Sequence, residues 1–138
     1  MLIEEIMTPT VRSIVPGLSL QAAAVRMRDW NIGSIPVHQN EEMIGMITDR
    51  DICCGAVAKG LDPAKTKVRD IMSKGVTYCF ADQECAVAAS IMEDKHIRRL
   101  LVHSRDGSVV GMVSVDDLAR ASPRLAGDVL EAGTSAAN

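Results

Sequence analysis

Two pairs of a hydroxyl and a carboxylate stand out among the residues that could do chemistry. Thr48 and Asp51 lie in the run Gly-Met-Ile-Thr-Asp-Arg-Asp. Ser114 and Asp117 lie in the run Gly-Met-Val-Ser-Val-Asp-Asp. A hydroxyl followed three residues later by an acid is typical of a helix capping box. A carboxylate held there can also accept both hydroxyls of a ribose, while the hydroxyl and the helix N-terminus face a phosphate. The two uses are compatible.

A second pair of segments, 31–37 and 96–102, repeats almost as closely. Gly33 in the first copy permits close backbone approach, and the apolar residues of both copies could sandwich a flat ring. The second copy has Arg98 and Arg99 instead. An arginine entering a cleft suits a phosphate, although a solvated surface charge is its commoner use. Neighbours on a strand point to opposite faces, so we expect at most one of the two in a given pocket.

These segments recur because the sequence of residues 3–54 is repeated, with substitutions, later in the chain. A shift of 65 positions lays Ile6 on Ile71, and one inserted residue near Gly107 raises the shift to 66. Halves that share apolar positions, glycines and a late aspartate share a fold. Each repeat of about 60 residues is marginal alone, so the two must pack on each other. We therefore expect two related pockets where the halves meet.

The elements that position these residues follow the same order in both halves. A short strand, a helix, two strands and a second helix are predicted from the apolar periodicity, with Ser19 capping the first helix and Asp106-Gly107 forming a hairpin turn. The first half has these elements at 11–15, 20–30, 34–38, 43–48 and 49–58, and the second half has a helix, two strands and a helix at 86–95, 99–103, 109–113 and 116–121. Ser122-Pro123 predicts an added helix to residue 130, and residues 133–138 are expected to fray.

The predicted fold class is α+β (α/β). It consists of tandem repeats, each a short β-sheet packed with helices, related by pseudo-two-fold symmetry. The predicted organisation is a first repeat at 1–60, a linker at 61–67, a second repeat at 68–121, and a C-terminal helix with a frayed tail at 122–138.

Composition narrows the possible partners. The 138 residues are 47% hydrophobic but include one Trp, one Tyr and one Phe, so aliphatic side chains and eight methionines must fill the core. A net charge of -3 without a basic run does not favour nucleic acid. The N-terminus does not resemble a secretory signal, and no apolar run reaches the ~18 residues that span a bilayer. We expect a cytoplasmic protein with no membrane partner.

The four cysteines are Cys53, Cys54, Cys79 and Cys85. They show no metal-ligand spacing, and in a reducing cytosol we expect four small buried hydrophobes. A redox role is the alternative.

Three motifs together resemble the cystathionine-β-synthase (CBS) domain pair, or Bateman module, in its stand-alone bacterial form. They are the openings Glu5-Ile6-Met7-Thr8 and Asp70-Ile71-Met72-Ser73, the strand Ile-Gly-Ser-Ile-Pro-Val, and the run Gly-Met-Ile-Thr-Asp-Arg-Asp-Ile. The resemblance covers residues 3 to about 121. It implies a regulatory module that binds AMP, ADP, ATP or S-adenosylmethionine in two clefts between the repeats and signals to an unidentified protein partner. It also implies a disc-like homodimer.

The resemblance assigns residues to both clefts by position. One cleft would use Thr48, Asp51, Gly33 and Ser34, closed by Val76, Thr77 and Ile97 of the other half. The related cleft would use Ser114, Asp117, Arg98 and Arg99, closed by Val11, Ile32 and Gly33. Leu101 occupies the position that Pro36 has in the first half, and Arg98 occupies the position that Gly33 has there. The two clefts should therefore differ in phosphate preference. No catalytic residue, metal ligand or required cofactor is expected.

Two other functions stay open, and catalysis is not expected. In a pure interaction module, Met43, Met46 or Met112 would fill the cleft. An enzyme needs a nucleophile, a base and an orienting group within reach, whereas His38 and His103 occupy equivalent strand ends and are expected to be structural. A thiol redox or metal sensor would use Cys53 and Cys54, but adjacent cysteines on a helix do not readily close a disulfide.

Overall fold

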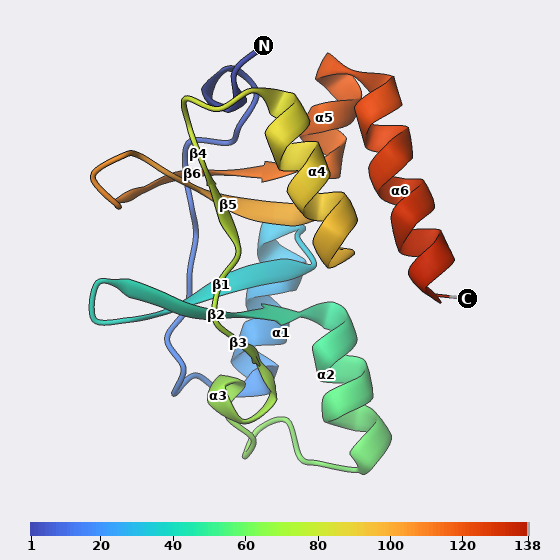
Figure 1. Ribbon diagram of the computed structural model, residues 1–138. Helices are drawn as coiled ribbons and strands as arrows, with labels where there is room; N and C mark the ends of the chain where they lie inside the picture. Colours follow the sequence, from blue (N-terminus) through green and yellow to red (C-terminus); the bar gives the residue numbers. More distant parts are fainter. Residues whose placement is uncertain (138) are drawn as a thin grey trace. The chain divides into compact units, whose positions relative to one another are not determined.

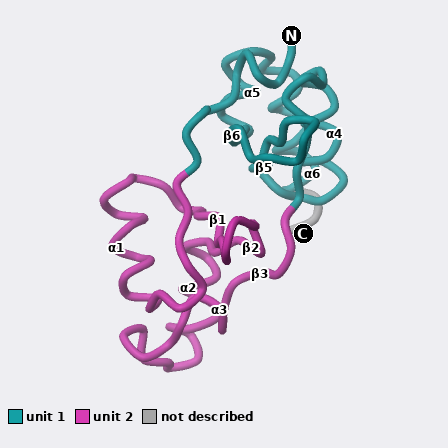
Figure 2. The backbone as a smooth tube through the Cα atoms, turned by 90° about the vertical axis from the view of Figure 1, so that its left-hand side faces the viewer, with its two compact units in different colours: residues 1–11, 77–138 teal, residues 12–76 magenta. Residues whose placement is uncertain are grey.

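The chain forms two compact units that do not coincide with the sequence repeats. The computed structural model describes residues 1–137, with side chains through residue 133. Unit 1 combines residues 1–11 with residues 77–138, and unit 2 comprises residues 12–76 (Figure 2). Each repeat thus contributes its opening segment to the unit that holds the body of the other repeat.

Unit 2 is a three-stranded antiparallel sheet with helices (Figure 1). Its elements are α1 (Leu20–Trp30), β1 (Ser34–Gln39), β2 (Glu42–Thr48), α2 (Asp49–Gly55), a 3-10 turn (Val57–Lys59), α3 (Val68–Ile71) and β3 (Ser73–Lys74). The strand order is β1-β2-β3. As predicted, α1 begins where the Ser19 hydroxyl accepts the Ala22 N–H at 3.1 Å. It ends at Asn31 in the left-handed conformation.

Unit 1 has a mixed three-stranded sheet, in the order β4-β5-β6. Its elements are a 3-10 turn (Ile3–Glu5), β4 (Tyr78–Phe80), α4 (Cys85–Lys95), β5 (Arg99–His103), β6 (Val109–Ser114), α5 (Val115–Ala121) and α6 (Pro123–Ala137). β4 runs parallel to β5, and β6 is antiparallel to β5. The predicted hairpin turn contains Gly107 at φ +91, a conformation that favours glycine.

Both cores are aliphatic, as the composition predicts. In unit 2, Ile35, Val37 and Ile47 of the sheet pack against α1 and α2 residues such as Leu20 and Ile52. The corresponding strand residues in unit 1 are Leu100, Val102 and Val113, which pack against Met92, Leu118 and residues of α6. Every second residue of these strands thus points toward the helices, and these residues form a separate core in each unit.

The exchanged opening segments are held against the second strand of each hairpin. Ile3 is fully buried in the core of unit 1, and Val68 is fully buried in the core of unit 2. Close to these residues, the backbone of each opening segment approaches a glycine of the neighbouring strand. A Cβ on Gly45 would lie 2.4 Å from the Ser73 carbonyl oxygen, and one on Gly111 would lie 2.8 Å from the Thr8 carbonyl oxygen. The glycines therefore permit the close approach of the two opening segments.

The predicted strand at 11–15 is wrong. In unit 2 this segment makes only an isolated parallel bridge between Ile14 and Val37. The corresponding segment in unit 1 forms β4, and there the Leu101 N–H donates to the Thr77 carbonyl. Pro36 stands where Leu101 stands in the other half and has no N–H to donate, so the ladder is interrupted.

The tail prediction is also wrong in part. The added helix begins at Pro123 as predicted, but α6 continues to Ala137 instead of ending near residue 130. It packs on both α4 and α5 and buries Ala126 and Val129 (Figure 1). The remaining residue of the expected frayed tail, 138, lies outside the described residues.

Candidate functional site

The first hydroxyl and carboxylate pair forms a capping box in unit 2. Thr48 ends β2 and is the N-cap of α2. Its hydroxyl oxygen accepts the Asp51 N–H at 3.0 Å, and Asp51 Oδ2 accepts the Thr48 N–H at 3.0 Å. The box fixes the Asp51 carboxylate at the junction of strand and helix. Asp51 remains half-buried, with part of the side chain open to solvent.

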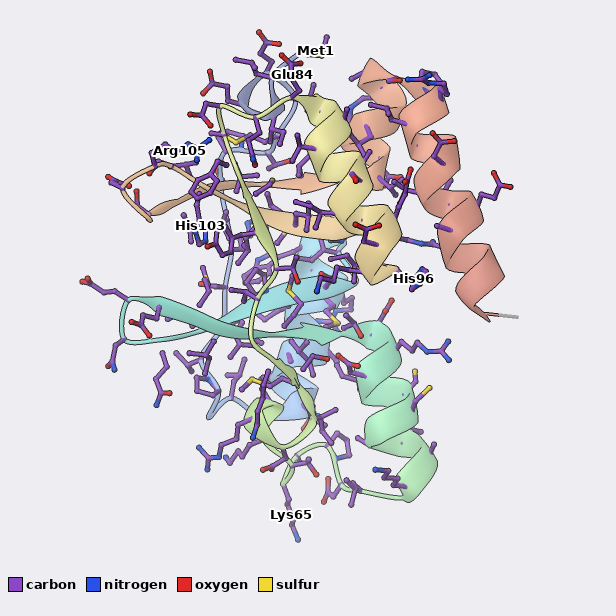
Figure 3. The ribbon with its side chains drawn as sticks, viewed as in Figure 1. Met1, Lys65, Glu84, His96, His103 and Arg105 are labelled. Atoms are coloured by element: carbon purple, nitrogen blue, oxygen red, sulfur yellow. The ribbon has the colours of Figure 1, made fainter. Side chains whose placement is uncertain are left out.

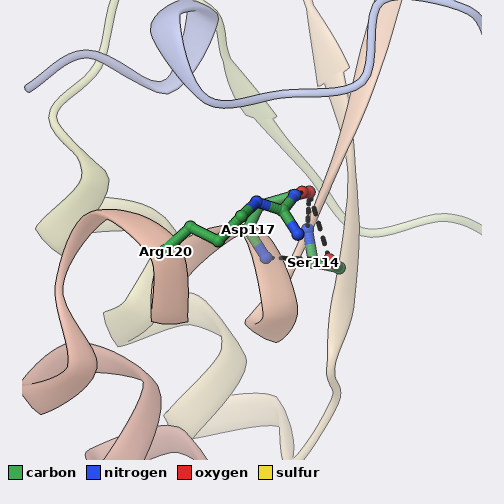
Figure 4. A network of polar contacts seen from close by, with 3 residues as sticks. All are labelled: Ser114, Asp117 and Arg120. Atoms are coloured by element: carbon green, nitrogen blue, oxygen red, sulfur yellow. Dashed lines mark hydrogen bonds and ion pairs between the residues drawn. The ribbon is translucent and has the colours of Figure 1, made fainter.

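The second pair forms the same box in unit 1, with two further contacts, one from the Ser114 hydroxyl to Asp117 Oδ2 at 3.1 Å and one from Arg120 (Figure 4). Asp117 Oδ2 accepts the Ser114 N–H at 2.8 Å, and the Ser114 hydroxyl accepts the Asp117 N–H at 3.2 Å. Asp117 is 5% exposed. Its other oxygen, Oδ1, accepts a hydrogen bond from the exposed Arg120 one turn later. Both carboxylate oxygens of Asp117 therefore already have partners.

The two boxes differ because of the residue three positions after the aspartate. The repeat places Cys54 where unit 1 has Arg120. Asp51 consequently has no ion pair among residues 1–137. The Arg120 contact was missed by the sequence interpretation, although its signal was available, since an acid and an arginine three residues apart on a helix are neighbours.

The glycine and arginine segments lie directly beside the boxes. The Asp49 N–H donates to the Gly33 carbonyl at 2.9 Å, next to Thr48. In unit 1 the Val115 N–H donates to the Arg98 carbonyl at 3.0 Å, next to Ser114. The two segments thus meet the strand and helix junction of their own unit.

The structure brings together some of the predicted residues that share a unit. In unit 2, Ser34 pairs with Thr48 across the β1 and β2 hairpin, and in unit 1, Arg99 pairs with Ser114. Arg98, which precedes β5, is exposed, and Arg99, the first residue of β5, is half-buried. The predicted residues are distributed as follows: Ile32, Gly33, Ser34, Thr48, Asp51 and Val76 in unit 2, and Val11, Thr77, Ile97, Arg98, Arg99, Ser114 and Asp117 in unit 1. Clefts that combine both sets stay a prediction.

The two equivalent histidines have different partners. His38 Nδ1 lies 2.7 Å from the Ser13 hydroxyl. His103, labelled in Figure 3, instead stacks on Tyr78 with 4.1 Å between ring centroids, and its buried Nε2 has no hydrogen-bond partner. Tyr78 stands at the position of Ser13 in the repeat, so an aromatic ring replaces the hydroxyl. Of the two imidazoles, only His38 therefore has a hydroxyl beside it.

The His103 environment predicts a pH-dependent stability. Burial lowers the pKa of His103 below its ordinary value of 6.5. The folded state therefore favours the neutral ring. The contribution of His103 to the free energy of unfolding is fully present above its unfolded pKa of 6.5, and it is lost as the pH falls from 6.5 toward the folded pKa. We expect the free energy of unfolding of the wild type to fall relative to that of His103→Phe, which keeps a ring for Tyr78, when pH is lowered from about 7.5 to about 5.5. Urea denaturation at both pH values measures the difference, and a difference independent of pH would contradict the assignment.

The cysteines correct part of the sequence interpretation. Cys79 and Cys85 are buried as expected, and burial raises the pKa of Cys79 to about 11. Cys53 and Cys54 are exposed, because Ile52 and Ala56 occupy the core-facing side of α2. Within residues 1–137, no group of three or more His, Cys, Asp or Glu side chains is arranged to hold a metal ion. The same residues contain no helix long and apolar enough to cross a membrane.

The chain belongs to the CBS domain family. The family profile described as CBS domain matches residues 3–54 and 68–124, which cover most of the chain. An uncharacterized protein of Methanopyrus kandleri, MK0525, is 35% identical over 87% of this chain and 63% of its own length. The chain thus spans less than two thirds of that relative. The CBS domain-containing protein YhcV of Bacillus subtilis is 33% identical over 85% of this chain and 82% of its own length.

Solved structures show the same fold. A CBS domain protein of Thermoplasma acidophilum, TA0289, matches with a TM-score of 0.86 at 22% identity, over 96% of this chain and 75% of that chain. The CBS domain pair of MJ0100, solved with 5′-methylthioadenosine and S-adenosyl-L-methionine, matches with a TM-score of 0.78 at 24% identity. The match covers 90% of this chain and 97% of that chain. CBS segments of enzymes match as well, among them 23% of a homoserine O-acetyltransferase of Methanohalobium evestigatum. The structure is thus a tandem CBS pair with an α+β fold.

Proposed function

We propose that this CBS pair is a regulatory module that binds an adenosine-type ligand and passes the signal to another protein. The observation that carries the proposal is the pair of carboxylates, Asp51 and Asp117, each fixed by a capping box. A carboxylate accepts hydrogen bonds only, and a vicinal diol supplies two donors in a matching spacing. A sugar with free 2′ and 3′ hydroxyls is therefore the ligand group that the boxes suit.

The neighbouring residues suggest which ligand each box prefers. Arg98 and Arg99 lie beside the Ser114 box, and neither has a carboxylate partner among the described residues. Their guanidinium groups suit a phosphorylated nucleotide. The Thr48 box has Gly33 and Ser34 instead, which suits a ligand of lower negative charge. The MJ0100 pair, which binds two different adenosyl compounds, shows that the fold accepts this ligand class.

The proposal includes the partners that such a module needs. The bound ligand would act through a homodimer and an unidentified protein partner. α1 and α2 would provide the dimer contact, because α6 covers the corresponding helices of unit 1.

A thermal melting series tests the proposal. A ligand that binds only the folded state stabilises it by about 2.7 kcal/mol at one hundred times its Kd. We expect AMP, ADP, ATP or S-adenosylmethionine to raise the melting temperature in proportion to the logarithm of its concentration, while inosine monophosphate at equal charge raises it less. If no adenosine compound moves the melting curve at about millimolar concentration, the chain is an interaction module without nucleotide. A shift produced by zinc or thiol oxidants alone would favour the cysteine sensor.

A further inference from the structure

The only tryptophan of the chain lies between two arginines on the surface of unit 2. Trp30 is the last residue of α1, and Arg26 lies one helical turn before it. The Arg26 guanidinium carbon is 5.8 Å from the centroid of the indole ring. Arg12, from the extended segment before α1, places its guanidinium carbon 5.2 Å from the same centroid. Segments far apart in sequence thus bring two cations to one aromatic ring.

The indole is anchored while the arginines are exposed. Trp30 is half-buried and packs against the core of unit 2. Arg12 and Arg26 are exposed, and neither guanidinium has an ion pair or a hydrogen bond among residues 1–137. A guanidinium that stacks on a ring through its face keeps its N–H donors at the edge. The cluster therefore presents two unpaired cations beside one half-buried aromatic ring, in a chain whose net charge is -3.

We propose that Arg12, Trp30 and Arg26 form a binding surface for an acidic peptide segment of a partner protein. Carboxylates of the segment accept bidentate hydrogen bonds from the guanidinium edges. Aliphatic groups of the same segment cover the indole. Trp and Arg are also the residues that most often dominate the binding energy of protein interfaces. The surface lies entirely within unit 2 and does not depend on the nucleotide proposal.

A peptide fits this surface better than a small anion or a nucleotide does. Inorganic phosphate would pair with the arginines but would leave the indole uncovered. A nucleotide would need an acceptor for its ribose, and the acid next to Trp30, Asp29, is already paired with Arg28 at 3.0 Å. An acidic peptide uses the cations and the apolar ring together.

Tryptophan fluorescence tests the inference, because Trp30 is the only tryptophan in the chain. The probe is a deca-glutamate peptide with an aliphatic residue at its centre, titrated into the full-length protein at low salt. We expect saturable quenching or a shift of the emission, with affinity that falls as salt is raised. The double variant Arg12→Gln/Arg26→Gln should weaken binding at least about tenfold, which is about 1.4 kcal/mol. Arg50→Gln, which removes an exposed arginine of α2, should change it less than about twofold.

Three results would overturn the inference. The first is an emission that does not respond to the peptide, and the second is binding that the double variant leaves unchanged. In the third, phosphate or ATP quenches Trp30 with the same arginine dependence and displaces the peptide, so that the surface is a phosphate site. Circular dichroism of the double variant confirms that it is folded, and a labelled peptide followed by anisotropy gives an independent affinity.

Discussion

Replacing Gly45 by alanine is expected to lower the free energy of unfolding by about 2–3 kcal/mol. The new Cβ would lie 2.4 Å from the Ser73 carbonyl oxygen, and a backbone atom cannot rotate away as a side chain can. β3 would therefore have to move from β2, and Val68, which α3 buries in the core just before β3, would move with it. Urea denaturation followed by Trp30 fluorescence reports this change, because Gly45, Val68 and Trp30 all lie in unit 2.

A matched substitution separates the close contact from the general effect of replacing glycine. A Cβ on Gly127 in α6 has nothing within 4 Å, so Gly127→Ala should stabilise the protein by about 0.5–1 kcal/mol through helix propensity. Gly111→Ala should destabilise unit 1, since its Cβ would lie 2.8 Å from the Thr8 carbonyl oxygen. If Gly45→Ala proved as harmless as Gly127→Ala, the exchanged opening segments would not be packed as described.

The double variant Asp51→Asn/Asp117→Asn is expected to weaken binding of the adenosine ligand by about 30-fold, or about 2 kcal/mol. The substitution removes the charge and one acceptor oxygen from each carboxylate. The remaining amide oxygen still accepts the N–H of Thr48 or Ser114, so the capping boxes and the fold should survive. Isothermal titration with the compound that stabilises the wild type most measures the loss, and Asp116→Asn, an exposed acid of the same α5 turn, is the control.

Substitution of Arg120 is expected to strengthen ligand binding, in contrast to substitution of the aspartates. Because Arg120 occupies Asp117 Oδ1, a sugar hydroxyl must displace it before it can bind there. Arg120→Cys, which copies the Cys54 of the other repeat, should therefore tighten nucleoside binding by a few-fold, as expected for an ion pair worth up to about 1 kcal/mol with one exposed partner. Weaker nucleoside binding by Arg120→Cys would show that Arg120 helps to hold the ligand instead of competing with it.

Local patterns predicted most of the elements. Ser19 and the apolar spacing after it marked α1, and the short apolar run within 99–103 marked β5 with correct ends. The hydroxyl and acid spacing at Ser114 and Asp117 predicted the capping box that the structure contains. These features depend on interactions between residues a few positions apart, which a sequence displays directly.

What could not be predicted depends on long-range contacts. Nothing near Ile3 indicates that it is buried with residues of the second half, since its apolar character suits either core. The exposure of Cys53 follows from which face of α2 meets the sheet. The interruption at Pro36 was readable in principle, but only once the parallel pairing with Ile14 was known.

In the proposed function, the capped aspartates hold the sugar of an adenosine ligand. The most direct measurement is a crystal structure of the protein grown with AMP, ATP and S-adenosylmethionine together. We expect adenosyl density with the ribose hydroxyls within hydrogen-bond distance of Asp51 or Asp117. Density for the ligand at a place remote from both carboxylates, or empty boxes at saturating ligand, would contradict it.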